Sequence, residues 1–175
     1  KRLQNGGDDV TRSYVRALEA RRVAHVLLGG RSFHAREEVL AVRNALAAIE
    51  WPDDELSVFA TLRGPFCALQ DDALLAFRHD HGSLHSFRKV PAESLNDVTR
   101  PVAEALGELH RLHRKRNRRP IADTLADFLE RTRAHAGIAN WPTGEQALAN
   151  VLRVLDLARR FESAVWLGPA FLNSL

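Results

Sequence analysis

Residues 23–50, VAHVLLGGRSFHAREEVLAVRNALAAIE, join two different hydrophobic patterns across a polar bend. Residues 23–28 form an apolar, β-branched run that two glycines end, and such a run predicts a short β-strand. From residue 37 onward apolar residues recur at helical spacing, which predicts a helix to about Glu50. Its first turn carries two acids that favour the positive end of the helix dipole. The predicted buried stripe of this helix consists of Val39, Val42, Leu46 and Ile49.

Helical patterns dominate the rest of the chain. Further helices are predicted over residues 9–22, 53–62 and 71–78, from Pro101 to about His113, over residues 120–137, and from Thr143 onward. Asp53 and Asp71 are suited to cap the helices that they begin, and Thr143 with Gln146 matches a capping box. The longest predicted loop covers residues 79–93, which include a glycine and a proline.

The predicted fold class is mainly α, with about seven helices and one short β-strand in the N-terminal part. A lone strand is incomplete, because its backbone donors and acceptors need partners along both edges. A second strand within the first seven residues, another copy of the chain, or a larger sheet from which the chain was excised would each supply them. The absence of methionine favours excision from an α/β domain.

Composition limits the classes of protein that this chain can represent. Its 175 residues suit one domain, or one domain with part of another, and 45% of them are hydrophobic and 27% charged. No apolar run approaches the roughly 20 residues of a membrane span, and the first residues do not form a secretory signal. The single Cys67 excludes an internal disulfide framework and fits a reducing compartment, so we expect a cytoplasmic protein.

Catalytic and metal-binding motifs are not found in the sequence. The phosphate-binding loop G-x-x-x-x-G-K-[ST] does not occur, so we expect no ATP site. The acidic run at residues 53–55 is interpreted as a helix cap and not as a magnesium motif. His79 with His81 and His110 with His113 lack a nearby carboxylate or thiolate, which makes metal binding weak. Cys67 has no assignable base, and we predict no catalytic residue and no metal site.

Residues 110–120, HRLHRKRNRRP, form the strongest local concentration of positive charge, and we call them the basic segment. Cations stabilise the C-terminal end of a helix, but six basic groups in nine residues exceed that need. One interpretation is a patch that contacts nucleic-acid phosphates without sequence preference. The other is a solvated face or a face that meets an acidic protein. The candidate DNA-binding residues here are Arg114, Lys115, Arg116, Arg118 and Arg119.

The order of elements over residues 14–66, YVRALEARRVAHVLLGGRSFHAREEVLAVRNALAAIEWPDDELSVFATLRGPF, resembles the UvrD/Rep superfamily of DNA helicases. The closest likeness is to the branch that includes RecB and AddA. In that family a helix feeds a strand that ends in two glycines, and an aromatic residue, Arg and Glu follow on a long helix. P-x-D-D and an Arg-Gly turn come next. The remainder of the chain is compatible with this family but carries no sharp motif.

The resemblance implies two parts: residues 1–50 as the edge of the second RecA-like domain, and residues 51–175 as the helical subdomain inserted into it. It also implies DNA contacts at the junction between them, at Gly29, Gly30, Arg31, Phe33, Arg36 and Glu37. Arg63 and Gly64 stand where these helicases carry an Arg-Gly-Ile-Gly turn that contacts duplex DNA. Here Pro65 and Phe66 follow instead, which departs from that pattern.

By this resemblance the parent protein is an ATP-dependent 3′-5′ DNA helicase, or a helicase-nuclease, of DNA repair and recombination. ATP and magnesium would bind elsewhere in that parent, so this portion alone is expected to be inactive. The expected partners are single-stranded DNA, duplex junctions and the remainder of the helicase chain, and a strand-paired dimer of the isolated portion is a further expectation. The alternative is a non-catalytic helical interaction or adaptor module with a basic face.

Overall fold

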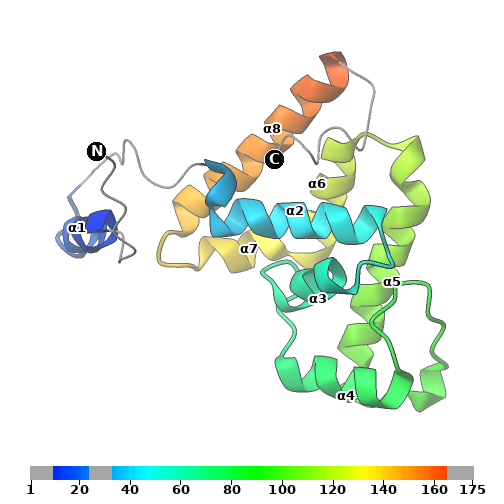
Figure 1. The fold of residues 1–175 in the computed structure, drawn as a ribbon. Coiled ribbons are helices and arrows are strands. Elements are labelled where there is room, and N and C mark those ends of the chain that lie inside the picture. Colours follow the sequence, from blue (N-terminus) through cyan, green and yellow to red (C-terminus); the bar gives the residue numbers. More distant parts are fainter. Residues whose placement is uncertain (1–9, 24–32, 165–175) are drawn as a thin grey trace, which may run out of the picture. The chain divides into compact units, whose positions relative to one another are not determined.

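The computed structural model describes residues 10–23 and 33–164, and the chain divides into two compact units, residues 1–32 and residues 33–175. The first unit contains α1 (Val10–Ala20), which lies within the predicted helix at residues 9–22. Seven helices of the second unit are labelled in Figure 1: α2 (Glu37–Glu50), α3 (Glu55–Arg63), α4 (Asp71–His81), α5 (Arg100–Lys115), α6 (Ile121–Thr132), α7 (Ala134–Ala139) and α8 (Gly144–Ala164). Short 3-10 turns occur at Phe33–Ala35, Ala92–Ser94 and Arg116–Arg118.

The prediction of a mainly α fold is confirmed, but the short β-strand that belonged to it is wrong for the described residues. Residues 10–23 and 33–164 contain no strand and are all-helical apart from turns and loops. Val23, the first residue of the predicted strand, donates its backbone N–H to Leu18 O at 2.9 Å. This bond belongs to the C-terminal turn of α1 and not to a sheet, so local helix termination satisfies the donor that a strand would have offered to a neighbour. The remaining residues of the prediction, 24–28, lie outside the described residues.

Helix α2 is the centre of the second unit. The predicted stripe of Val39, Val42, Leu46 and Ile49 is confirmed, since all four side chains are buried. They pack in one continuous core with α3, α5 and α8, and burial of each such side chain stabilises the fold by about 1.5–3 kcal/mol. Figure 1 shows α2 crossing this unit, with α4 placed beyond α3 and α5 and away from α8.

The helix boundaries differ from the predicted ones by a few residues. Asp54, not Asp53, caps α3, because its carboxylate accepts the Ser57 N–H at 3.1 Å and the Ser57 hydroxyl at 2.6 Å. Helix α4 runs on into the predicted loop and ends at Gly82, whose φ of 90° suits glycine. Helix α6 ends before Gly137, because Arg133 adopts the left-handed conformation and α7 begins directly after it.

The predicted capping box at the start of α8 is replaced by a polar link to α2. The Gln146 amide donates to Asn150 Oδ1 at 3.2 Å, and Asn150 in turn donates to Glu38 Oε1 at 2.6 Å. Glu38 and Asn150 are both buried, so this pair satisfies polar groups that would otherwise destabilise the core. Helices α2 and α8 are therefore joined by hydrogen bonds as well as by apolar packing.

The boundary between the two compact units falls between residues 32 and 33, whereas the predicted division falls after Glu50. Helix α2 shares the core of the helices that follow it, so it belongs to the second unit. The assignment of residues 1–50 and 51–175 to two parts of a helicase stays a prediction. No helix among the described residues has the length and apolar character that crossing a membrane requires.

Candidate nucleic-acid interface

The basic segment spans the end of α5, the 3-10 turn at Arg116–Arg118 and the start of α6. Helix α5 buries Val102, Leu106, Leu109 and Leu112 against the core, which directs its charged positions outward or towards α6. The final turn of α5 carries His113, Arg114 and Lys115, where positive charge complements the helix dipole. The local fold therefore concentrates cations at one end of the molecule's second unit.

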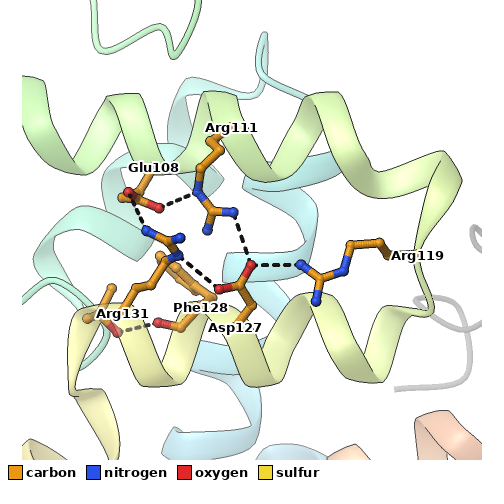
Figure 2. A network of polar contacts seen from close by, with 7 residues as sticks. Glu108, Arg111, Arg119, Asp127, Phe128 and Arg131 are labelled. Atoms are coloured by element: carbon orange, nitrogen blue, oxygen red, sulfur yellow. Dashed lines mark hydrogen bonds and ion pairs between the residues drawn. The ribbon is translucent and has the colours of Figure 1, made fainter.

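Some of these cations form ion pairs with acidic side chains of the protein itself. Figure 2 shows Arg111 and Glu108 of α5 facing Asp127 and Arg131 of α6, with Arg119 reaching Asp127 from the turn between the helices. We call these five residues the arginine network. Its contacts are Arg111 Nε to Glu108 Oε2 at 2.7 Å, Arg111 Nη1 to Asp127 Oδ2 at 3.0 Å, Arg119 Nη1 to Asp127 Oδ2 at 2.9 Å, Arg131 Nε to Asp127 Oδ1 at 2.9 Å and Arg131 Nη1 to Glu108 Oε1 at 3.5 Å.

Asp127 is the centre of the arginine network, and its side chain is only 17% exposed. Burial on its own raises the pKa of a carboxyl group, but hydrogen bonds from Arg111, Arg131 and Arg119 and the charge of Arg111 outweigh this effect. The pKa of Asp127 is therefore held below its ordinary value. An ionised Asp127 thus joins α5 to α6, and Arg111 and Arg119 stabilise the fold through their ion pairs with it.

Arg116 is also engaged, at the C-terminal end of α2. Its Nε lies 3.2 Å from Glu50 Oε2, and its Nη1 donates to His113 O at 2.8 Å. His113 donates from Nδ1 to Ile49 O at 2.7 Å. The last carbonyl groups of a helix have no partner within the helix, so His113 satisfies one of them at the end of α2, while Arg116 pairs with the carboxylate of the last α2 residue.

Arg114, Lys115 and Arg118 remain, and we call them the open cations. All three side chains are exposed, and none forms an ion pair with an acidic residue among the described parts of the chain. Exposed arginine and lysine side chains without an acidic partner can bind phosphate, arginine through a forked pair of donors. Of the five residues predicted here, the structure leaves these three available and engages Arg116 and Arg119 internally.

The predicted junction residues are only partly described. Gly29, Gly30 and Arg31 lie outside the described residues. Phe33 packs against the core, and the Arg153 guanidinium of α8 lies 5.2 Å from the centroid of its ring, so Phe33 anchors the start of α2. Arg36 precedes α2 as its N-cap residue and is half-buried, whereas Glu37 is exposed in the first turn.

Arg63 and Gly64 lie apart from the basic segment, at the turn after α3. Arg63 Nε lies 2.6 Å from Asp71 Oδ1, so its charge is paired across the turn to α4. A Cβ atom on Gly64 would lie 2.6 Å from Ala60 O, which explains glycine at this helix end. Whether Arg63 and Gly64 contact DNA stays a prediction, and the local geometry already gives both residues a structural role.

Phe87 and three histidines form a cluster that sequence reasoning missed. The centroid of the Phe87 ring lies 4.5 Å from that of His110, 5.0 Å from that of His113 and 5.5 Å from that of His85. His110 and His113 lie one helical turn apart on α5 and were considered only as a weak metal pair. The spacing of His110 and His113, one helical turn apart, was the signal that the sequence offered. Their contact with Phe87 could not be predicted, because it depends on how the loop before α5 folds back.

The surroundings of Cys67 make its thiol unreactive. Burial raises the pKa of the Cys67 thiol to about 12, so this thiol stays protonated and is a poor nucleophile at neutral pH. Within residues 10–23 and 33–164, no group of three or more His, Cys, Asp or Glu side chains could hold a metal ion.

Comparison with known proteins yields a distant similarity to a helicase/nuclease. No protein-family model matches the chain. Over 139 residues, which are 75% of this chain, it is 27% identical to an ATP-dependent helicase/nuclease subunit of Geobacillus kaustophilus (strain HTA426). The aligned part covers 11% of that relative, so the chain spans only a small portion of its length. This similarity supports a relationship to helicases at a coarse level.

Proposed function

We propose that this chain is a portion of an ATP-dependent 3′-5′ DNA helicase, or helicase-nuclease, of DNA repair and recombination, and that it contributes DNA contacts. Support comes from the similarity to part of a helicase/nuclease protein and from the helicase-like sequence motifs over residues 14–66. In this proposal residues 1–50 belong to the edge of the second motor domain and residues 51–175 to its inserted helical subdomain. ATP and magnesium bind in the remainder of the parent chain.

The open cations carry the DNA-binding part of the proposal. Neutralising a phosphate releases a condensed counterion, so affinity falls as salt rises. If Arg114, Lys115 and Arg118 each neutralise one phosphate, a plot of log K against log salt concentration has a slope of about −2 for single strands and about −2.7 for duplex. Such binding has no sequence preference, because phosphates are the same at every base.

Charge reversal tests this assignment. We expect the double variant Arg114→Glu/Lys115→Glu to weaken binding of a fluorescently labelled oligonucleotide about tenfold or more at low salt, and to reduce the magnitude of the salt slope by about 1.4 on a single strand or about 1.8 on duplex. Fluorescence anisotropy over a salt series measures both quantities. The matched control is Arg43→Glu/Arg133→Glu, which makes the same charge change at two exposed arginines outside the basic segment.

The control separates a defined interface from general attraction. Equal losses in the two double variants would mean that net charge alone governs binding. Unchanged binding in Arg114→Glu/Lys115→Glu would remove both residues from the interface. Circular dichroism of each variant establishes that the helices are intact.

A helical protein-interaction module is the second candidate, and exposed apolar side chains on α3 and α4 favour it. Leu56 is 76% exposed, Leu75 is 71% exposed and Phe59 is 38% exposed. Phe59 and Leu75 line a hollow of about 290 Å³ that also involves Leu74 and Leu84. Contiguous apolar surface of this kind is typical of protein contacts. Failure of the unmodified chain to bind DNA at low salt would favour this second function over the first.

A further inference from the structure

Phe87 lies in the segment between α4 and α5, and 44% of its surface is exposed. An exposed phenylalanine alone needs no explanation. This one is held in a defined position, because its ring lies nearly perpendicular to the rings of His110 and His113, with interplanar angles of 87° and 89°. Edge-to-face contacts of this geometry are favourable for aromatic pairs.

Hydrogen bonds fix two of the three histidines that surround Phe87, His85 and His113. His85 Nδ1 accepts the Phe87 backbone N–H at 3.1 Å, which leaves Nε2 to donate to Asp53 Oδ1 at 3.0 Å. His113 is held by its bond to Ile49 O at the end of α2. The exposed ring is therefore positioned before any ligand arrives, which lowers the entropy cost of binding.

Positive charge flanks this ring. Lys89 is exposed two residues after Phe87, and the exposed Arg114 follows His110 by one turn of α5. Partial burial lowers the pKa of His110, and the charges of Arg114, His113 and Lys89 lower it further. The neutral form of the His110 ring is therefore favoured. Neither Lys89 nor Arg114 pairs with an acid among the described residues, so both charges are available to an anion.

A preformed aromatic ring beside unpaired cations is complementary to a ligand with flat faces and a charged backbone. Single-stranded nucleic acid has both, since every unpaired base offers a π face and every linkage a phosphate. In a duplex the base faces are already stacked on their neighbours and are not accessible to a side chain. The charge and the exposed ring together therefore favour a single strand over a duplex.

We propose that Phe87 is a base-stacking position for single-stranded DNA, with Lys89 and Arg114 contacting the phosphates on either side of the stacked base. This inference rests on the proposed DNA-binding function and specifies its substrate class. It gives the proposed interface two parts: the open cations of the basic segment attract any DNA, and Phe87 selects a strand with free bases.

The test compares two labelled oligonucleotides of equal length, one of thymidines and one of abasic residues, together with a hairpin duplex. Phe87→Leu keeps apolar contact with the histidines but removes the π face. We expect it to bind the thymidine strand about tenfold more weakly, with unchanged binding of the abasic strand and the hairpin. Phe87→Tyr should bind like the wild type. Phe59→Leu, a change at another exposed phenylalanine, is the matched control and should also leave binding unchanged.

Several outcomes overturn the inference. Equal weakening on the thymidine and abasic strands would mean that Phe87 only positions the cations. Equal affinity of the wild type for both strands, or full binding by Phe87→Leu, would mean that no base is stacked. Binding of neither strand nor hairpin by the wild type at low salt would contradict the proposed function itself, and is thereby distinguished from failure of the stacking site alone.

Discussion

Arg118 and Arg119 are neighbours in the chain, yet they belong to two regions of the basic segment that use positive charge in opposite ways. Arg119 reaches Asp127 and completes the arginine network, whereas Arg118 is exposed and has no acidic partner among the described residues. The network contributes to the fold, and the open cations contribute charge to the surface. The comparison shows that basic residues of one run can form a binding surface only where the tertiary structure places no acidic side chain against them.

Removing the central acid of the network should have the largest effect on stability. We expect Asp127→Ala to lower the free energy of unfolding by about 2 kcal/mol, because it leaves the mostly covered Arg111 and two partly exposed arginines without their shared carboxylate. Urea denaturation followed by circular dichroism measures the loss. DNA binding should persist in conditions where the variant is folded. A change below about 0.5 kcal/mol, the usual range of surface substitutions, would show that the network is not structural.

The stability conferred by Asp127 should depend on pH in one direction. Its pKa is lowered in the folded protein, so this contribution is fully present above the ordinary carboxyl pKa of about 3.9 and is lost as pH falls through the lower, folded value. We expect the wild type to lose stability between neutral pH and pH 3 more steeply than Asp127→Asn, which cannot titrate. Parallel curves for the two proteins, measured as thermal unfolding midpoints, would contradict this expectation.

The smallest expected effects come from the adjacent residues Arg118 and Arg119, whose substitutions should change different properties of the protein. Arg119→Gln should cost about 0.5 kcal/mol of stability, since its ion pair is partly exposed, and should leave DNA affinity nearly unchanged. Arg118→Gln should leave stability unchanged and reduce the magnitude of the salt slope of DNA binding by about 1. Urea denaturation and anisotropy on both variants check the pair. The reverse assignment of effects would mean that the division between network and open cations is incorrect.

Much of the helical framework could be predicted from the sequence. Periodic apolar residues predicted α2 together with its buried stripe, and prolines predicted the starts of α5 and α6. The exact ends of the helices depended on packing. At the end of α6 the residue in the left-handed conformation is Arg133 and not a glycine, because the short α7 that follows buries Ala134 and Ile138. The predicted strand was wrong at Val23, the one residue of it that the structure describes, because the Val23 N–H completes the C-terminal turn of α1, which an apolar run does not reveal.

The candidate site could be predicted only in outline. The basic segment was visible as a local run, but its division was not, because the acids that engage Arg116 and Arg119 come from other elements: Glu50 ends α2 and Asp127 lies in α6. Phe87 escaped notice for the same reason, since its contacts with His110 and His113 join residues more than twenty positions apart. Spacing within one element cannot reveal contacts that the tertiary fold creates.

The attachment of His113 and Arg116 to the end of α2 has a mechanical consequence. Both residues flank Arg114 and Lys115, and both hold the final residues of the helix at the centre of the core. Tension on a strand gripped at Arg114 or Lys115 would pass straight into α2, with no slack loop in between. Because this connection is rigid, a force applied at this end of the molecule would be transmitted to the whole helical unit.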